Sequence, residues 1–402
     1  MKSGLWKSDW FVGLVVTLLF LFASATAPLQ GLERFAYDWG VRASDREPSD
    51  RVAVIAIDDE SIANLGRWPW PRDLHARLID RLSQGGAKVV GYTVFFLEPQ
   101  LDPGLVLINE LQELYDASAL ANQLPADADF LGGLLAELAA ENGSGSSGGS
   151  EGYRDLHRFF AGSSLAGPVN TEIAALGSKL AEAQATLDTD AILAASVGAA
   201  GNVVVSMPLI LGEPQGNPDA ELPEYVLRSS LVNVTDRVGA VQHGLFPIPS
   251  RAALPPIPEI GEPAAAVGHL NSVPDVDGGV RTEPLVLLHY DAYLPSLALQ
   301  IAAQSLNLAP DDVQIFLGEG VQLGRLRIGT DPALQMHTFF YGDRDGARAP
   351  FPVDSFYDVI SGRIPAEKYA GKVVLVGATA VGVGSPQVTP ISPAMPPVLT
   401  LA

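Results

Sequence analysis

The chain contains no cysteine among its 402 residues. This absence excludes a disulfide framework, a zinc site built on paired cysteines, and a thiol nucleophile. Positive charge is also scarce, because 25 Lys and Arg stand against 46 Asp and Glu, for a formal net charge of -21. Neutralising the phosphates of a nucleic acid requires clustered Lys and Arg, so we expect no nucleic-acid partner.

Motifs that would indicate catalysis or cofactor binding are missing as well. There is no phosphate-binding P-loop, and the histidines form no HExxH pair. The glycine-rich stretch at 318–324 has the wrong spacing for a dinucleotide loop, and "GSSLAG" at 162–167 lacks the GxSxG pattern of a serine hydrolase. We therefore expect no catalytic residue, no cofactor and no metal.

The N-terminus carries a long apolar segment. Lys2 and Lys7 precede an uncharged stretch at 10–27, about as long as the roughly 17 to 20 residues that span a bilayer. The positive-inside rule then places the N-terminus in the cytoplasm and the acidic bulk outside. A cleaved signal peptide is the alternative, since residues 23–25 resemble a cleavage site. Apolar residues at helical spacing from 29 to 39 favour a retained anchor whose helix continues out of the membrane.

Buried-strand patterns recur along the rest of the chain. Residues 51–58 are continuously apolar and rich in β-branched side chains, as is typical of a strand buried on both faces of a parallel sheet. A helix opened by Pro71 and a second apolar run at 87–96 follow, which predicts a βαβ unit. The pattern returns at 371–379. The predicted fold class is therefore α/β, with a mixed, largely parallel sheet and covering helices. Further strands are expected at 201–211, 265–273, 279–290, 324–330 and 334–342, with a helix at 294–307.

Residues 101–187 interrupt this pattern with acidic, helix-forming sequence, so we predict a helical insertion. The spacing of a short coiled-coil seam recurs at Ile173, Leu176, Leu180, Ala183 and Leu187. Residues 105–115 are the expected partner helix. An amphipathic flap that lies on its own domain explains the same spacing equally well.

The segment "DVDGGVR" at 275–281 contains clustered acids. It lacks the further acidic ligands and the final Glu of a calcium-binding loop, so we interpret it as a turn between strands. Arg281 is expected to pair with Asp275 or Asp277 across that turn.

Several separated segments together resemble one known family. They include "YDWGVR" at 37–42, "WPWPR" at 68–72, "DVDG" at 275–278 and "VLVGAT" at 374–379. In this order they resemble the CHASE domain of the second type, an extracytoplasmic sensor of bacterial transmembrane receptors. Members usually continue through three further membrane helices to a cytoplasmic histidine or Ser/Thr kinase or a nucleotide cyclase. The resemblance implies that residues 1–28 are a cytoplasmic tip and transmembrane helix and 29–50 a juxtamembrane helix. It implies a sensor domain at 51–394 and the approach to a missing second membrane helix at 395–402.

Ligands of open α/β sheets bind beyond the carboxyl ends of the strands. We therefore predict a polar ligand pocket there, composed of Asp58, Asp59, Ser61, Trp68, Trp70, Arg72, Thr93, Glu98, Gly377, Thr379 and Ser385. The alternative is structural: Asp59 caps a short helix while Trp68 and Trp70 pack over the sheet. The family usually carries Asp where this chain has Thr93 and Ser385, and Gly where it has Pro397. If those acids hold a ligand or cation, this chain lacks that site.

The resulting hypothesis is a non-enzymatic sensory domain in the inner membrane, with its main domain periplasmic or extracellular. It would pass an unknown small-molecule or protein signal to a kinase or cyclase outside this chain. The expected partners are the lipid bilayer and a second copy, through the N-terminal helices or the insertion. The alternative hypothesis is an exported, membrane-anchored assembly protein that uses the fold and insertion for protein contacts.

Overall fold

The computed structural model describes residues 9–24, 27–44, 46–141, 149–163, 167–217, 221–341 and 351–402. The chain divides into two compact units. The α/β unit comprises Met1–Trp70, Arg77–Glu98 and Val197–Ala402. The helical unit comprises Pro71–Ala76 and Pro99–Ser196.

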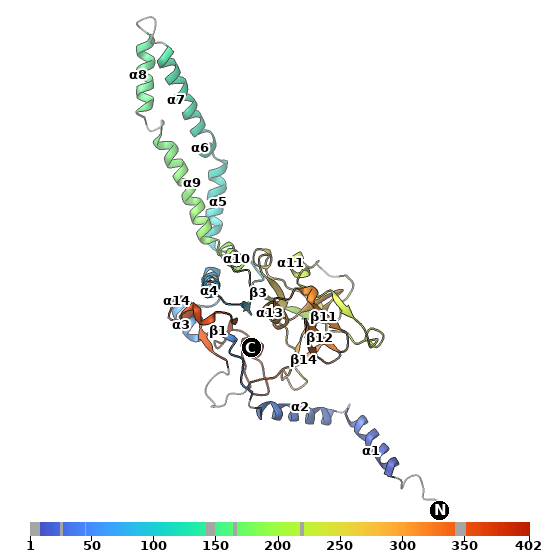
Figure 1. The fold of residues 1–402 in the computed structure, drawn as a ribbon. Helices are drawn as coiled ribbons and strands as arrows, with labels where there is room; N and C mark the ends of the chain where they lie inside the picture. The colour runs from blue at the N-terminus through green and yellow to red at the C-terminus, as the bar shows by residue number, and fades with distance from the viewer. Residues whose placement is uncertain are drawn as a thin grey trace, which may run out of the picture. The chain divides into compact units, whose positions relative to one another are not determined.

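A six-stranded sheet forms the centre of the α/β unit (Figure 1). Its strands are, in spatial order, β15 (Val353–Ser355), β1 (Val52–Ile57), β16 (Val373–Ala378), β2 (Val89–Tyr92), β3 (Val203–Met207) and β7 (Ala266–His269). Every neighbouring pair is parallel. The strands are short, β-branched and mostly buried, as a parallel sheet covered on both faces requires. The prediction of an α/β fold with a largely parallel sheet is confirmed.

The expected βαβ unit is more open than predicted. Helices α3 (Asp59–Leu65) and α4 (Arg72–Gln84) follow β1, but β16 lies between β1 and β2. Strand β16 pairs with both neighbours, for example through Leu375 opposite Val54 and Gly91. Sequence proximity alone did not reveal that the last strand of the chain enters the middle of the sheet.

Two predicted strands are each divided in two. Residues 201–211 form β3 and β4 (Leu209–Leu211), separated at Pro208. Residues 279–290 form β8 (Thr282–Pro284) and β9 (Val286–His289). In both cases a proline lies at or beside the break, and it has no backbone N–H for the ladder of hydrogen bonds.

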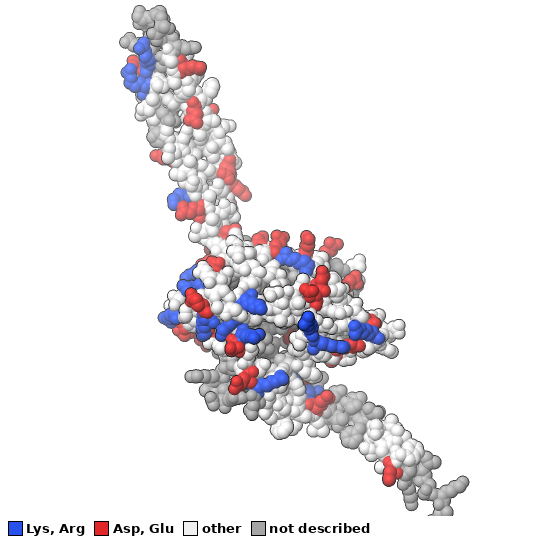
Figure 2. Space-filling view, viewed as in Figure 1, with Lys and Arg blue, Asp and Glu red and all other residues white. Residues whose placement is uncertain are grey.

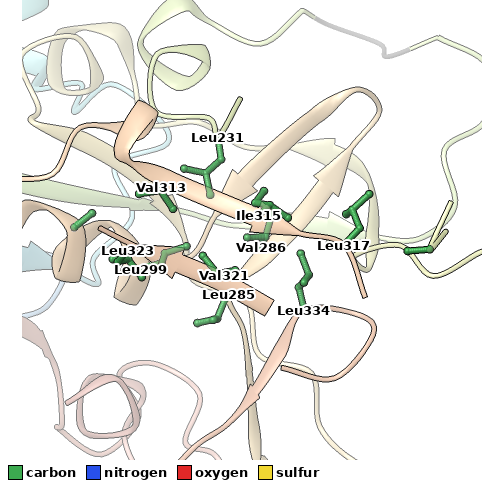
Figure 3. Close-up of a cluster of buried hydrophobic side chains, with 12 residues drawn as sticks. Leu231, Leu285, Val286, Leu299, Val313, Ile315, Leu317, Val321, Leu323 and Leu334 are labelled. Atoms are coloured by element: carbon green, nitrogen blue, oxygen red, sulfur yellow. The ribbon is translucent and has the colours of Figure 1, made fainter. Parts of the chain in front are cut away.

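The second half of the α/β unit builds smaller sheets around a core of its own. One has the order β10-β9-β6-β4 and another the order β13-β12-β11-β5, while β14 pairs with β8. Their cluster of buried side chains includes Ile315 against Val286 and Leu323 near Leu299 of helix α13 (Figure 3). The strands are β5 (Asn233–Thr235), β6 (Pro249–Ala253), β10 (Ala292–Pro295), β11 (Val313–Phe316), β12 (Gly320–Leu323), β13 (Leu326–Gly329) and β14 (Gln335–His337). The helices are α11 (Glu224–Leu227), α12 (Pro258–Gly261), α13 (Leu297–Ser305), α14 (Phe356–Ser361) and α15 (Pro397–Leu401).

Two helices precede the sheet, α1 (Asp9–Ser24) and α2 (Ala27–Arg42). The sequence predicted that a single helix continues through this region, and its junction at residues 25 and 26 lies outside the described residues. Within the described ranges, no helix is both long enough and apolar enough to cross a membrane.

The helical unit is built on antiparallel pairs (Figure 1). Helix α5 (Pro103–Ala117) packs against α9 (Pro168–Leu187), and α7 (Leu124–Glu141) packs against α8 (Gly149–Ala161). Short α6 (Ala119–Asn122) joins α5 to α7, and α10 (Thr189–Ala200) follows α9. The pairing of α9 with residues 105–115 agrees with the predicted partner helix.

One member of the predicted seam is wrong. Leu176 is exposed, and Gly177 instead faces the α5 helix. The Tyr115 hydroxyl donates a hydrogen bond to the carbonyl oxygen of Ile173 at 2.7 Å, and its ring occupies the space where a Cβ at Gly177 would stand. A search for regularly spaced apolar residues cannot find this contact, because glycine has no apolar side chain and tyrosine is counted as polar at its hydroxyl.

Candidate functional site

The carboxyl ends of β1, β16 and β2 lie side by side, and several predicted site residues follow them. The backbone N–H of Thr379 donates to the carbonyl oxygen of Ile57 at 3.0 Å, which places Thr379 beside Asp58 at the end of β1. The Thr93 hydroxyl donates to the carbonyl oxygen of Val376 at 3.1 Å. Asp58, Thr93, Gly377 and Thr379 therefore share one edge of the sheet.

Asp58 is the N-cap of α3, and Asp59 is an exposed residue in its first turn. One Asp58 carboxylate oxygen accepts from the Ser61 backbone N–H at 2.8 Å, from the Ser61 hydroxyl and, at 3.0 Å, from the Ser355 hydroxyl. The fully buried Ser61 hydroxyl also accepts from the Tyr357 N–H at 3.1 Å. The residue that caps α3 is therefore Asp58, and not Asp59 as predicted. Asp58 and Ser61 hold α3 against β15 and α14.

The two tryptophans differ in burial. Trp70 is only 2% exposed, and its indole N–H donates to the Gly66 carbonyl oxygen at 2.9 Å. Its ring centroid lies 4.9 Å from that of Phe356 and 5.1 Å from that of half-buried Trp68. Trp70 is thus a core residue of this corner, in agreement with the structural alternative.

The chain itself fills the edge between β16 and β2. A Cβ at Gly377 would stand 2.1 Å from the Thr93 hydroxyl oxygen and 2.7 Å from the Val398 Cβ. Val398 belongs to α15 and is fully buried. Glycine at position 377 therefore permits the C-terminal helix to sit on the strand ends.

The remaining predicted site residues are elsewhere. Arg72 belongs to the helical unit, where its buried guanidinium pairs with Asp190. Asp190 also accepts from the Gln100 backbone N–H at 2.8 Å, and the Gln100 side chain accepts from the Arg72 N–H at 2.9 Å. Glu98 and Ser385 are exposed residues of the α/β unit. Arg72 thus has a structural role at the base of the insertion.

A second polar site is centred on Arg281. Its guanidinium forms a two-bond contact with Asp38 of α2, Nε to Oδ1 at 2.7 Å and Nη2 to Oδ2 at 2.9 Å. It also donates to Asp275 at 2.8 Å and to Asp277 at 2.9 and 3.0 Å. The predicted pairing of Arg281 across its turn is confirmed. Asp38 was missed as a partner, although it lies within the "YDWGVR" segment that carried the family resemblance.

Charge and burial explain the ionisation of this Arg281 cluster, which comprises Arg281, Asp38, Asp275 and Asp277. The hydrogen bond to Asp38 is the main cause that raises the Arg281 pKa above its ordinary value. The hydrogen bond from Arg281 lowers the pKa of Asp277 to about 2. Burial, reinforced by the Asp38 charge, raises the pKa of Tyr37 to about 12. The cluster therefore joins α2 to the loop after β7 through charge-assisted hydrogen bonds.

Apolar and backbone contacts extend this link to the C-terminal segment. Val41 of α2 packs with Phe340 and Met395 in a small buried cluster, against which Tyr37 and Leu399 also pack. The Arg42 Nε donates to the carbonyl oxygen of Pro390 at 2.6 Å, and the Tyr37 hydroxyl donates to the carbonyl oxygen of Thr338. Helix α2 and residues 387–402 are thus packed together.

Burial also disfavours the charged form of two titratable groups elsewhere in the α/β unit. Burial lowers the pKa of His269 to about 3 and raises that of Glu283 to about 8, where the Ser296 hydrogen bond opposes it. In the part of the chain that the structure describes, no group of three or more His, Asp or Glu side chains is arranged to hold a metal ion.

The geometry defines an α/β domain with a parallel sheet, docked to the helix that precedes it. The family model of the CHASE2 domain matches residues 12–402, so the chain belongs to the CHASE2 domain family. CHASE2 domains are sensory, extracytoplasmic and not catalytic. No curated protein and no solved structure matches the chain.

Proposed function

We propose that this chain is the extracytoplasmic sensor of a bacterial transmembrane receptor, and that it passes its signal to a cytoplasmic kinase or nucleotide cyclase. The observation that carries the proposal is the docking of α2 onto the C-terminal segment through the Arg281 cluster and the Val41 contacts. Both segments are then displaced together when the domain changes shape. A receptor that signals by displacement of helices requires a connection of this kind between its first helix and its C-terminal segment.

A continuous set of contacts connects the strand ends to this pair. Val398 packs against Gly377 at the end of β16, and Leu399 contacts both the sheet core and the Val41 cluster. A ligand or regulatory contact near Asp58, Asp59, Thr93 or Thr379 would move α15 and, with it, α2. The signal is then a small molecule or protein whose affinity for the domain differs before and after α15 moves.

Attachment to the membrane belongs to the same proposal. The apolar segment at 10–27 anchors the chain, with Lys2 and Lys7 in the cytoplasm. The exposed apolar side chains of α1, among them Trp10, Val12 and Leu18, support this because a water-soluble helix rarely presents such a surface.

Cysteine labelling tests the location, because the chain has no cysteine of its own. Val276→Cys lies in an 88% exposed position, and Ser3→Cys precedes the apolar segment. In intact cells a membrane-impermeant maleimide should label Val276→Cys, and it should label Ser3→Cys only after lysis. Labelling of both positions, or of neither, in intact cells contradicts the proposed topology.

The coding sequence beyond residue 402 tests the signalling role. Further membrane helices followed by a kinase or cyclase are expected for a receptor. A stop codon at that point favours the second candidate, an exported assembly protein. That candidate is supported by the exposed apolar side chains of the insertion, such as Phe130 and Phe159.

A further inference from the structure

Most of the exposed apolar side chains on the long helices of the insertion recur at one position relative to the seam, whereas Val106 and Phe130 are exposed outside it. On α5, Leu107, Leu111 and Leu114 are exposed, and each comes one residue before a half-buried side chain, namely Ile108, Gln112 and Tyr115. Tyr115 faces α9, where its hydroxyl donates to the carbonyl oxygen of Ile173. The exposed stripe is thus distinct from the seam that joins the two helices, and it lies next to it on α5.

On the other three long helices, too, an exposed apolar residue comes directly before a residue of the seam. On α7, Leu131 precedes Gly132, which faces Phe160, and Leu134 precedes the buried Leu135. On α8, exposed Leu156 and Phe159 precede half-buried His157 and buried Phe160. On α9, exposed Leu176 precedes Gly177, which faces Tyr115.

Helix geometry places these residues on the same side of each pair. One residue is a turn of about 100° around a helix. In an antiparallel pair the two chains run in opposite directions, and their seam residues also point in opposite directions, toward each other. The two reversals cancel, so the residue before the seam points to the same side of the pair from both helices. We call this side the apolar face: Leu107, Leu111, Leu114, Leu131, Leu134, Leu156, Phe159 and Leu176.

The opposite side of the pairs, one residue after the seam, is polar or small. It carries Glu113 and Asp116 on α5, Asp129 on α7 and Arg158 on α8, with Ser178 on α9. Figure 2 shows long uncharged stretches of the hairpin surface, with acidic side chains along its edge. Apolar side chains are therefore concentrated on one of the two broad sides.

We propose that the apolar face binds the same face of a second copy of this chain, which would form a four-helix bundle. The eight side chains are between 41% and 76% exposed. Seven Leu and one Phe this exposed on one side are more than a free surface usually gathers, and such a patch marks an interaction site. In a dimer with two-fold symmetry the same face of both copies forms the interface, so no other surface of the chain is needed.

Charge favours a second copy over a lipid surface. The charged residues among the described positions on the apolar face are Asp127, Glu172 and Lys179, so acids outnumber the single base. A helix face that lies on a bilayer is instead rich in Lys and Arg beside its apolar residues. The dimer would serve a sensor and an assembly protein alike.

The test compares substitutions on the two sides of α5 in the full chain, purified in detergent. Leu107→Gln, Leu111→Gln and Leu114→Gln together should weaken dimerisation at least about tenfold, as loss of a central apolar cluster does. The matched control is Val106→Gln, Glu110→Gln and Glu113→Gln, at exposed positions of α5 outside the apolar face, where Val106 is itself 47% exposed. Analytical ultracentrifugation over a range of concentrations gives the dissociation constants, and circular dichroism checks that helix content is retained.

If the triple leucine variant loses helix content, Phe159→Gln and Leu176→Gln, made singly, provide the same test on other helices. Dimerisation weakened by these variants and not by the control supports the proposal. It is overturned by a wild-type chain that is monomeric at every concentration, or by a dimer that the leucine and control variants affect equally. A monomer whose Leu111 and Leu114 are protected from hydroxyl-radical footprinting would assign the face to another part of the same chain, which also overturns it.

Discussion

Removal of the Arg281 side chain is expected to release α2 from the α/β unit. Arg281 is 10% exposed and Asp38 17% exposed, so Arg281→Met leaves a largely buried carboxylate without its cation. Breaking such a buried pair costs about 3 to 5 kcal/mol. Asp275 and Asp277 are 35% and 44% exposed, so their pairs with Arg281 are screened by solvent and add little. We therefore expect the free energy that docks α2 to the α/β unit to fall by about 3 kcal/mol, the lower end of this range.

Hydrogen exchange followed by mass spectrometry measures this loss where it occurs. If α2 exchanges by undocking, a loss of about 3 kcal/mol should speed the exchange of residues 27–42 roughly a hundredfold. Arg281→Lys keeps the charge but not the planar fork, and it should lose about 1 to 2 kcal/mol. Arg363→Met is the matched control, because Arg363 pairs with Glu60 and Asp358 while 56% exposed. The reasoning fails if Arg281→Met accelerates exchange in α2 no more than Arg363→Met does.

Acid should affect the same contact. Arg281 lowers the pKa of Asp277 to about 2 in the folded protein, against about 3.9 for an unfolded Asp. A lowered pKa contributes stability above the unfolded value, and this stability is lost as the pH falls from about 4 to 2. Because Asp277 is 44% exposed, solvent screening keeps this acid-sensitive step small. It should be smaller still in Arg281→Met, where only the Gly279 backbone N–H and the Arg34 charge still lower the pKa of Asp277.

Three further outcomes are expected. Asp58→Ala should lose about 0.5 to 2 kcal/mol of thermal stability as a lost N-cap, whereas Asp58→Asn and Asp59→Ala should lose much less. A receptor that also signals normally with Asp58→Asn would exclude a ligand role for that carboxylate. Gly377→Ala should cost about 1 to 3 kcal/mol by overpacking against Thr93 and Val398, while Gly329→Ala, which has no atom within 4 Å of its Cβ position, should be nearly neutral. Deletion of 104–186 with a short Gly/Ser linker should leave a cooperatively melting domain, because Arg72, Gln100 and Asp190 are retained, and a broad or absent transition would show that the insertion is not independent.

The local patterns of the sequence predicted the centre of the fold well. Continuous β-branched runs identified β1 and β16, because a strand buried on both faces has no polar positions to obscure the pattern. The turn before Arg281 was also predictable, since its acids and its base lie within seven residues. Strand order was not, because β16 is separated from both neighbours by hundreds of residues and nothing local encodes its position between them.

The candidate site was less predictable for the same physical reason. Asp58 was expected at a strand end because it follows an apolar run, whereas Thr93 was expected inside the apolar run at 87–96 and in fact follows β2, which ends at Tyr92. The sequence gives no sign that Val398 occupies the space above Gly377, since this depends on a contact between distant segments. Asp38 likewise acquires its role only when α2 meets Arg281.

The central claim is that α2 and the C-terminal segment move as one docked pair. Spin labels at Trp39→Cys and Ala394→Cys, both at exposed positions of a chain without native cysteine, report the distance between them in bilayer nanodiscs. Double electron–electron resonance should give one narrow distance distribution for this labelled chain. Adding Arg281→Met should broaden it. A broad distribution before that change, or a narrow one that Arg281→Met leaves unaltered, would contradict the claim.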